Sequence, residues 1–187
     1  MGKMLKTMIT AKTIKPSNSQ IHQCDIFFNI NVIENIKEEN STLIREDIMF
    51  PLIICLNQEC DLVQNYNEPD KHMLLHLLIA PVFLFDSFLA GNHWGNIMPP
   101  SKGLKEKDTK GRLITQNEIP RFHYLEFLES EKLPRLIIDF KHFFTINRNY
   151  LYEKVDKYRL CSLDNLFKEK ISQRFSYFLS RIGLPEV

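Results

Sequence analysis

The stretch "IMFPLIICLN", residues 48–57, is a nearly unbroken apolar run rich in isoleucine. A run of this length and composition predicts a strand that is buried on both faces. A second run of the same kind, "KHMLLHLLIAPV" at residues 71–82, follows the turn-forming segment "QNYNEPD" at residues 64–70. The two runs therefore predict two buried strands separated by a turn.

Other apolar stretches predict further strands around these two. Residues 24–33 have the β-branched and aromatic content of a strand, and residues 121–128 alternate between two faces. Residues 134–146 predict one more strand and its exit. The charged residues 34–47 lie between two strand segments, and we expect them to form a surface loop.

The end of the chain predicts an amphipathic helix. In "SLDNLFKEKISQRFSYFLSRIGL" the apolar residues recur at helical spacing and form one stripe. Ser162 or Asp164 can cap its start, and Gly183 can end it. Residues 81–92 predict a shorter helix, with Pro81 in its first turn and Gly91 at its exit. We therefore expect an α+β fold of mostly antiparallel strands, with the C-terminal helix covering an apolar surface.

The composition is that of a soluble globular protein, with 44% hydrophobic and 25% charged residues in 187. We expect a tail or a loose first strand at residues 1–20 and one domain over residues 21–187. No apolar stretch is long enough for a membrane span, and the N-terminal residues lack the apolar core of a signal peptide. The four cysteines form no C-x-x-C pair, so we expect free thiols and a cytoplasmic location.

The charge is unevenly distributed although the net charge is only +1. Residues 1–100 hold 7 Lys/Arg and 11 Asp/Glu, whereas residues 101–187 hold 17 and 12. Residues 92–120 are rich in Gly, Pro and Lys and predict a long excursion from the core. Basic residues with nearby aromatics can hold a single strand by phosphate contact and base stacking. The candidates for this role are Lys105, Lys107, Lys110, Arg112, Trp94 and Tyr124. The alternative is a solvated loop beside a core hairpin.

The order of these segments resembles the MazF/PemK-like toxin family. Asp25-Ile26 is similar to the family's first strand, Pro51 to its second and Ala80-Pro81-Val82 to its third. Asp139 with Thr145-Ile146 is similar to the stretch before its helix. The resemblance covers about residues 24–182 and implies a small SH3-like β-barrel with a C-terminal helix. The chain is also similar to uncharacterised bacterial proteins with a Gln-x-Cys-Asp-Leu/Ile strand end.

RNA-cleaving members of that family use an arginine beside the second-strand proline and a hydroxyl on the third strand. Here Phe50 precedes Pro51, His76 stands near the hydroxyl position, and Cys24 replaces the glycine before the first aspartate. The resemblance therefore implies a non-catalytic or partner-dependent module, in a bacterial toxin–antitoxin or phage-defence setting. It also implies a protein partner or a homodimer. The alternative is a divergent, metal-independent endoribonuclease for single-stranded RNA, with His76 and Arg45 as catalytic residues.

The segment Glu59-Cys60-Asp61 offers another candidate site. Cys60 could act as a nucleophile with His72 or His76, although flanking carboxylates oppose thiolate formation. Alternatively, Cys60 and Asp61 close a strand end by hydrogen bonding to the following turn. A zinc site at these histidines matches no known zinc spacing. Glu59 and Asp61 with Asp139 and Lys141 resemble a metal-dependent nuclease site, but the strand order of that fold is not evident. We therefore expect no metal and no cofactor.

Overall fold

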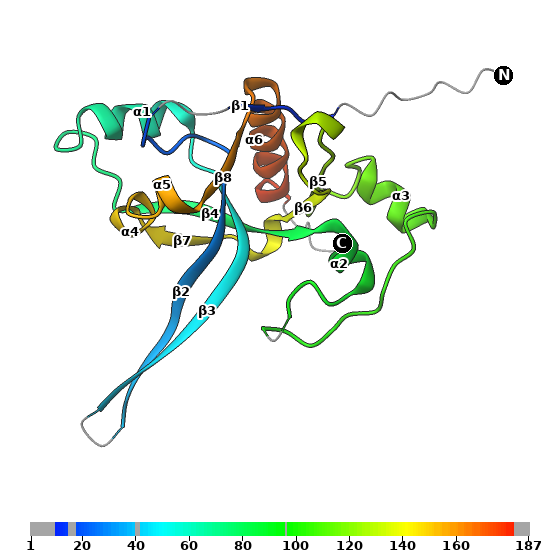
Figure 1. Ribbon diagram of the computed structural model, residues 1–187, viewed down its shortest axis with the longest axis horizontal. Coiled ribbons are helices and arrows are strands. Elements are labelled where there is room, and N and C mark those ends of the chain that lie inside the picture. The colour runs from blue at the N-terminus through cyan, green and yellow to red at the C-terminus, as the bar shows by residue number, and fades with distance from the viewer. Residues whose placement is uncertain (1–9, 15–17, 40–41, 96, 182–187) are drawn as a thin grey trace, which may run out of the picture.

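The computed structural model describes residues 10–14, 18–39, 42–95 and 97–181. The described chain is α+β, with an antiparallel sheet that curls into a half-barrel and a C-terminal helix (Figure 1). Its strands are β1 (Thr13–Ile14), β2 (Asp25–Glu39), β3 (Thr42–Cys55), β4 (His76–Leu84), β5 (Phe122–Leu125), β6 (Leu136–Asp139), β7 (Phe144–Asn147) and β8 (Arg159–Leu163). Its α-helices are α1 (Glu59–Asn67), α2 (Phe85–Ala90), α3 (Thr109–Thr115), α4 (Arg148–Tyr152), α5 (Val155–Tyr158) and α6 (Asn165–Leu179).

The sheet follows the order β1-β8-β2-β3-β4-β6-β5, and β7 also pairs with β4. Strand β4 splits its free edge, because His76–Ile79 pair with β7 while Val82–Leu84 pair with β6. This split turns the sheet around its own core. No helix among the described residues is long and apolar enough to cross a membrane.

The predicted central strand is confirmed and is covered on both faces. Ile54 of β3 belongs to a core cluster with Phe167, Ile171 and Phe175 of α6. Its neighbour Ile53 belongs to a second cluster, on the opposite face of the sheet. The predicted C-terminal helix is α6, and Asp164 caps it by accepting a hydrogen bond from the Phe167 N–H at 3.2 Å. The expected end at Gly183 lies outside the described residues.

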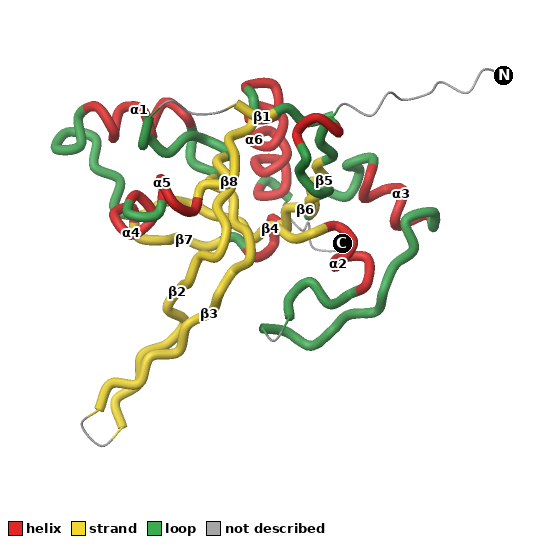
Figure 2. Tube along the Cα trace, viewed as in Figure 1, coloured by secondary structure: helices red, strands yellow, loops and turns green. Residues whose placement is uncertain are grey.

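Residues 34–39 and 42–47 form strand rather than the expected surface loop. They extend β2 and β3 into a long two-stranded arm, which projects away from the body (Figures 1 and 2). We define the arm as residues 31–39 and 42–49. The charged side chains of this segment favoured a loop. Both faces of the outer arm are exposed to solvent, however, so a strand can carry charged side chains there.

Two further expectations are corrected by the structure. Residues 64–67 belong to helix α1, which has the acidic residues Glu59 and Asp61 in its first turn and the buried residue Leu62 on its inner face. Pro81 lies in β4, whereas the predicted short helix α2 ends at Gly91, with φ +80°. Within residues 1–20, for which a tail or a loose first strand was expected, the short strand β1 pairs with β8 and Ala11 is fully buried.

A buried polar network anchors the start of β2. Asp25 is fully buried and accepts hydrogen bonds from the His22 N–H at 3.0 Å, the Arg159 guanidinium at 3.2 Å and the Ser162 hydroxyl. Burial raises the pKa of Asp25, although these donors oppose the rise. The contacts join β2 to β8.

Replacing Cys24 with glycine should cost less stability than replacing it with alanine. Its φ is +62°, a left-handed conformation that disfavours every side chain with a Cβ. Both variants lose the buried thiol, but only Cys24→Gly removes this strain. We expect Cys24→Gly to be about 1 kcal/mol more stable than Cys24→Ala by urea denaturation. At Cys161 in β8 the order should reverse, because glycine weakens a strand. The same order at both sites would contradict the argument.

Candidate nucleic-acid interface

A basic pocket lies where the excursion at residues 92–120 returns to the sheet. The cavity is about 400 Å³ and joins the end of α2, the following loop, α3 and the start of β5. Its polar and aromatic lining includes His93, Trp94, Lys102, Lys110, Arg121, Phe122 and His142. Three permanent cations therefore share one cavity with aromatic rings.

Arg121 is held in this pocket by a buried carboxylate. Its Nε and Nη2 donate to the two oxygens of Asp139, at 2.8 and 2.5 Å. The Asp139 side chain is 1% exposed and also accepts from the Lys141 N–H at 3.0 Å. The guanidinium lies 4.7 Å from the centre of the Phe122 ring. A two-bond pairing of this kind fixes the guanidinium plane, so the cation is in place before a ligand arrives.

Two histidines flank Trp94 in the same pocket. The indole centre is 6.0 Å from the centre of His93 and 4.7 Å from that of His142. Desolvation lowers the pKa of both imidazoles, and the nearby Arg121 lowers each further, while Asp139 opposes the shift. His142 Nε2 lies 3.9 Å from Asp139 Oδ2. Both imidazoles are therefore largely neutral at neutral pH.

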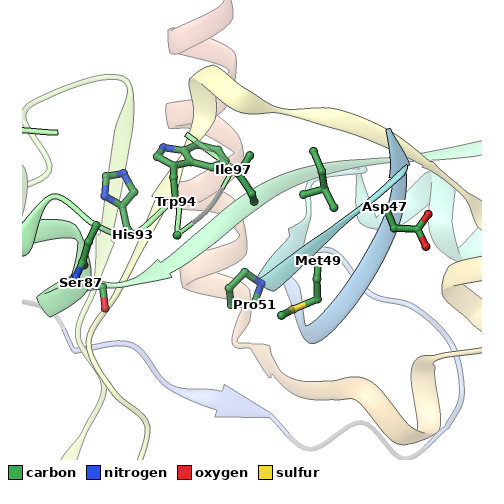
Figure 3. Close-up of a pocket in the computed structure, with 10 residues that line it drawn as sticks. Asp47, Met49, Pro51, Ser87, His93, Trp94 and Ile97 are labelled. Atoms are coloured by element: carbon green, nitrogen blue, oxygen red, sulfur yellow. The ribbon is translucent and has the colours of Figure 1, made fainter. Parts of the chain in front are cut away.

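A second hollow, of about 600 Å³, adjoins the basic pocket. Met49 and Pro51 of β3 line one side of it, and Trp94 and Ile97 line the other (Figure 3). His93 and Trp94 line both cavities. Trp94 also packs edge-on against Phe83 of β4, with ring centres 4.7 Å apart. The tryptophan thus links the two hollows to the sheet.

The structure brings some of the predicted nucleic-acid contacts together. Trp94 and Lys110 line the basic pocket, and Lys105, Lys107 and Arg112 are exposed on the same excursion. Tyr124 is only 4% exposed, and its ring packs edge-on against Phe85 at 4.7 Å. Its burial raises its pKa to about 12. In this structure Tyr124 supports the core and cannot stack on a base.

The structure does not bring the predicted catalytic residues together. His76 begins β4 at an exposed position opposite Asn147, beyond the pairing of β4 with β3. Arg45 lies on the exposed arm and donates to Asp47. It precedes Cys55 by ten residues, which is about 33 Å of strand. His76 and Arg45 therefore lie toward opposite ends of the β3–β4 region.

The segment Glu59-Cys60-Asp61 forms the first turn of α1. Cys60 is exposed, with its Sγ 3.6 Å from Gln58 Oε1 and 3.7 Å from Asp61 Oδ1. Asp61 and His72 line a small hollow of about 240 Å³. Within the described ranges, no group of three or more His, Cys, Asp or Glu residues is placed to hold a metal ion.

Glu59 serves as a structural link in this turn. It accepts hydrogen bonds from His22 Nδ1 at 2.6 Å, the Gln23 N–H at 2.9 Å and Lys168 Nζ at 3.1 Å. Burial alone would raise the pKa of Glu59, but these donors outweigh it and the pKa is lowered. The Glu59 carboxylate thereby links α1 to the turn that precedes β2 and to α6.

Comparison with known proteins gives no family. No protein-family model matches the chain. No curated protein matches it either.

Proposed function

We propose that the chain is a single-stranded RNA-binding module, and that the basic pocket is its binding site. The observation that carries the proposal is the gathering of Lys102, Lys110 and Arg121 around Trp94 in one cavity. Lysine and arginine neutralise phosphates, and an aromatic side chain can stack on any base. Lys105, Lys107 and Arg112 extend the positive surface along the excursion.

We further propose that the half-barrel is a divergent MazF/PemK-like, SH3-like barrel. The sequence order of the motifs supports this, and so does the conformation of Cys24. The family has glycine at that position, and Cys24 adopts the positive φ that glycine favours. On this reading the module works with a protein partner or a second copy, in a bacterial toxin–antitoxin or phage-defence setting.

Removing two pocket cations should weaken RNA binding selectively. The variant is Lys102→Ala with Lys110→Ala, and the probe is a fluorescent single-stranded RNA of mixed sequence. We expect affinity to fall about tenfold or more at physiological salt. The slope of log affinity against log salt should also become shallower, by about 0.7 for each lost phosphate contact. Anisotropy titrations at several salt concentrations measure both quantities.

The matched control replaces two exposed lysines away from the pocket, Lys37 on the arm and Lys157 on α5. It removes the same net charge, so a general electrostatic effect would weaken binding equally. Equal losses in the two double variants, or no loss in either, would reject the pocket as the RNA site.

A second candidate function is metal-independent cleavage of the bound RNA. The specific observation in its favour is the pair His93 and His142, two largely neutral imidazoles beside Arg121 in the same cavity. An imidazole can remove a proton from a 2′-hydroxyl or donate one to a leaving oxygen. In this candidate, His93 and His142 take the roles that the sequence resemblance gave to His76 and Arg45.

A further inference from the structure

One face of the arm, which we call the apolar face, carries four apolar side chains that are about half exposed or more. The cross-strand pairs Asn31–Met49, Ile33–Asp47, Ile36–Arg45 and Glu38–Leu43 all lie on this face. It therefore carries Met49, Ile33, Ile36 and Leu43, which are 51, 48, 57 and 73% exposed. On the opposite face, Phe50 and Ile30 pack into the core. Exposed apolar residues grouped on one face mark an interaction surface.

The apolar face runs directly into the larger hollow. Met49 belongs to both, and Asp47 from the same face also lines the hollow. Figure 3 shows Met49 and Pro51 across from Trp94 and Ile97, with Asp47 at one end. The hollow is about 600 Å³, which is enough room for a large anchoring side chain. We call the apolar face and the adjoining hollow, which share Met49 and Asp47, the groove.

The charge of the arm indicates which partner would fit this groove. Its charged residues are Glu34, Glu38, Glu39, Glu46 and Asp47 against Lys37 and Arg45, a balance of −3. Lys37 pairs with Glu46 at 2.9 Å, and Arg45 pairs with Asp47. Glu34, Glu38 and Glu39 have no ion-pair partner within the described ranges. The groove therefore offers apolar contact with negative charge beside it.

We propose that this groove binds a basic amphipathic segment of another protein. The segment places apolar side chains along the stripe, one of them in the hollow, and its Lys or Arg residues beside the free glutamates. Docking would also supply the packing that an isolated two-stranded arm lacks. A second copy of this chain is disfavoured as the occupant, because stacking two arms face to face brings equal negative charges together.

Docking in the groove would act on the basic pocket through a shared wall. His93 and Trp94 line both cavities, so a side chain in the hollow contacts residues that also face the pocket. This consequence rests on the proposed RNA binding, whereas the docking itself does not. A partner that fills the hollow thus provides a physical route to partner-dependent activity.

The test uses a synthetic peptide of Lys and Leu, about 18 residues or five helical turns long, with leucine at helical spacing. Trp94 is the only tryptophan in the chain and lines the hollow, so its fluorescence responds to a bound peptide. Because Trp94 also lines the basic pocket, the arm variant described below assigns the signal to the groove. We expect saturable binding of this peptide and about tenfold weaker binding of a Glu/Leu peptide with the same spacing. Omitting RNA keeps the result independent of the proposed function.

The decisive variant is Ile36→Asp with Leu43→Asp. It makes the arm more acidic, so purely electrostatic attraction of the peptide would increase. We expect binding to weaken at least about tenfold instead, with the melting temperature near that of the parent. Leu166→Asp, at a 54% exposed site on α6, is the matched control and should bind normally.

Three outcomes would overturn the proposal. They are no fluorescence change with the Lys/Leu peptide, equal binding of the Glu/Leu peptide, and unchanged binding by the Ile36→Asp, Leu43→Asp variant. Sedimentation of the protein without peptide measures its oligomeric state and so tests the other possible occupant, a second copy of the chain. A dimer that the double variant abolishes would assign the groove to a second copy and reject the peptide.

Discussion

His93→Asn and His142→Asn should each slow cleavage of a single-stranded RNA by about 10²- to 10⁴-fold. The basis is the second candidate function, in which the two imidazoles beside Trp94 act on one phosphodiester. Asparagine keeps a polar side chain but cannot exchange a proton near neutral pH. Affinity for RNA should change little, because Lys102, Lys110 and Arg121 remain in place. Gel analysis of cleavage and anisotropy measurements of binding separate the two effects.

The chemistry needs only protein side chains and RNA. One imidazole takes the proton of a 2′-hydroxyl, and the 2′-oxygen forms a bond to phosphorus. The bond from phosphorus to the 5′-oxygen breaks, and the second imidazole protonates that oxygen. The products are a 2′,3′-cyclic phosphate and a 5′-hydroxyl. The fixed guanidinium of Arg121 stabilises the charge that builds on the phosphoryl oxygens.

Asp139 raises the pKa of both imidazoles, but its close approach to His142 separates the roles of the two histidines. Its carboxylate lies 3.9 Å from His142 Nε2 and favours the protonated form of that ring. We therefore assign His142 as the acid and His93 as the base. Both imidazole pKa values are lowered, so the protonated acid becomes scarce at neutral pH. The rate of cleavage should consequently peak below about pH 6.5.

An RNA with one 2′-deoxynucleotide at the cleavage site is the substrate control, since it can bind but cannot react. His76→Asn is the protein control, because His76 is an exposed residue at the start of β4 and does not line the pocket. Loss of cleavage only in His76→Asn would restore the role that the sequence resemblance gave it. If the parent protein binds RNA but does not cleave it, the endoribonuclease proposal is rejected and the RNA-binding proposal stands.

Local sequence patterns predicted the parts of the fold that depend on neighbouring residues. The apolar run at residues 48–57 predicted a strand buried on both faces, and Asp164 predicted the start of α6. The arm was missed because residues 34–47 alternate charge with isolated isoleucines. Its strands are held by pairing across the hairpin, which a single segment does not reveal.

The candidate site was predicted only in part, for the same reason. Trp94 and Lys110 stood out because the excursion concentrates basic and aromatic residues. Arg121 and His142 lie in other segments and reach the pocket through the pairing of β5 with β6, in which Phe122 is opposite Asp139. No local spacing encodes that register, so the histidine pair and the clamped arginine emerge only from the fold.

His123 should make the protein lose stability as the pH falls, beginning near pH 6.5, above the range in which carboxylates titrate. The imidazole lies on β5 with 2% exposure, and its Nδ1 has no hydrogen-bond partner among the described atoms. Desolvation lowers its pKa to about 3, helped by Arg174 and Lys170 of α6. The ring is therefore neutral in the folded protein over most of the acidic range.

The sign follows from where each state takes up a proton. Above about pH 6.5 the ring is neutral in both states, and the full stability is present. Below that pH the unfolded chain binds a proton and the folded protein does not, so the free energy of unfolding falls until about pH 3. Between pH 7 and 4.5 this residue alone should remove on the order of 2 to 3 kcal/mol. Urea denaturation at several pH values measures the slope.

His123→Phe keeps a buried ring and removes the titration, so the pH dependence should flatten by that amount. His142→Asn is the comparison, because its side chain is 27% exposed and water screens much of the effect. It should flatten the slope far less. If His123→Phe retains the parent slope, His123 is protonated in the folded protein. In that case its Nδ1 has a partner, and the packing of α6 over β5 is looser than the contacts of Arg174 with Asn117, Ile119 and Phe122 indicate.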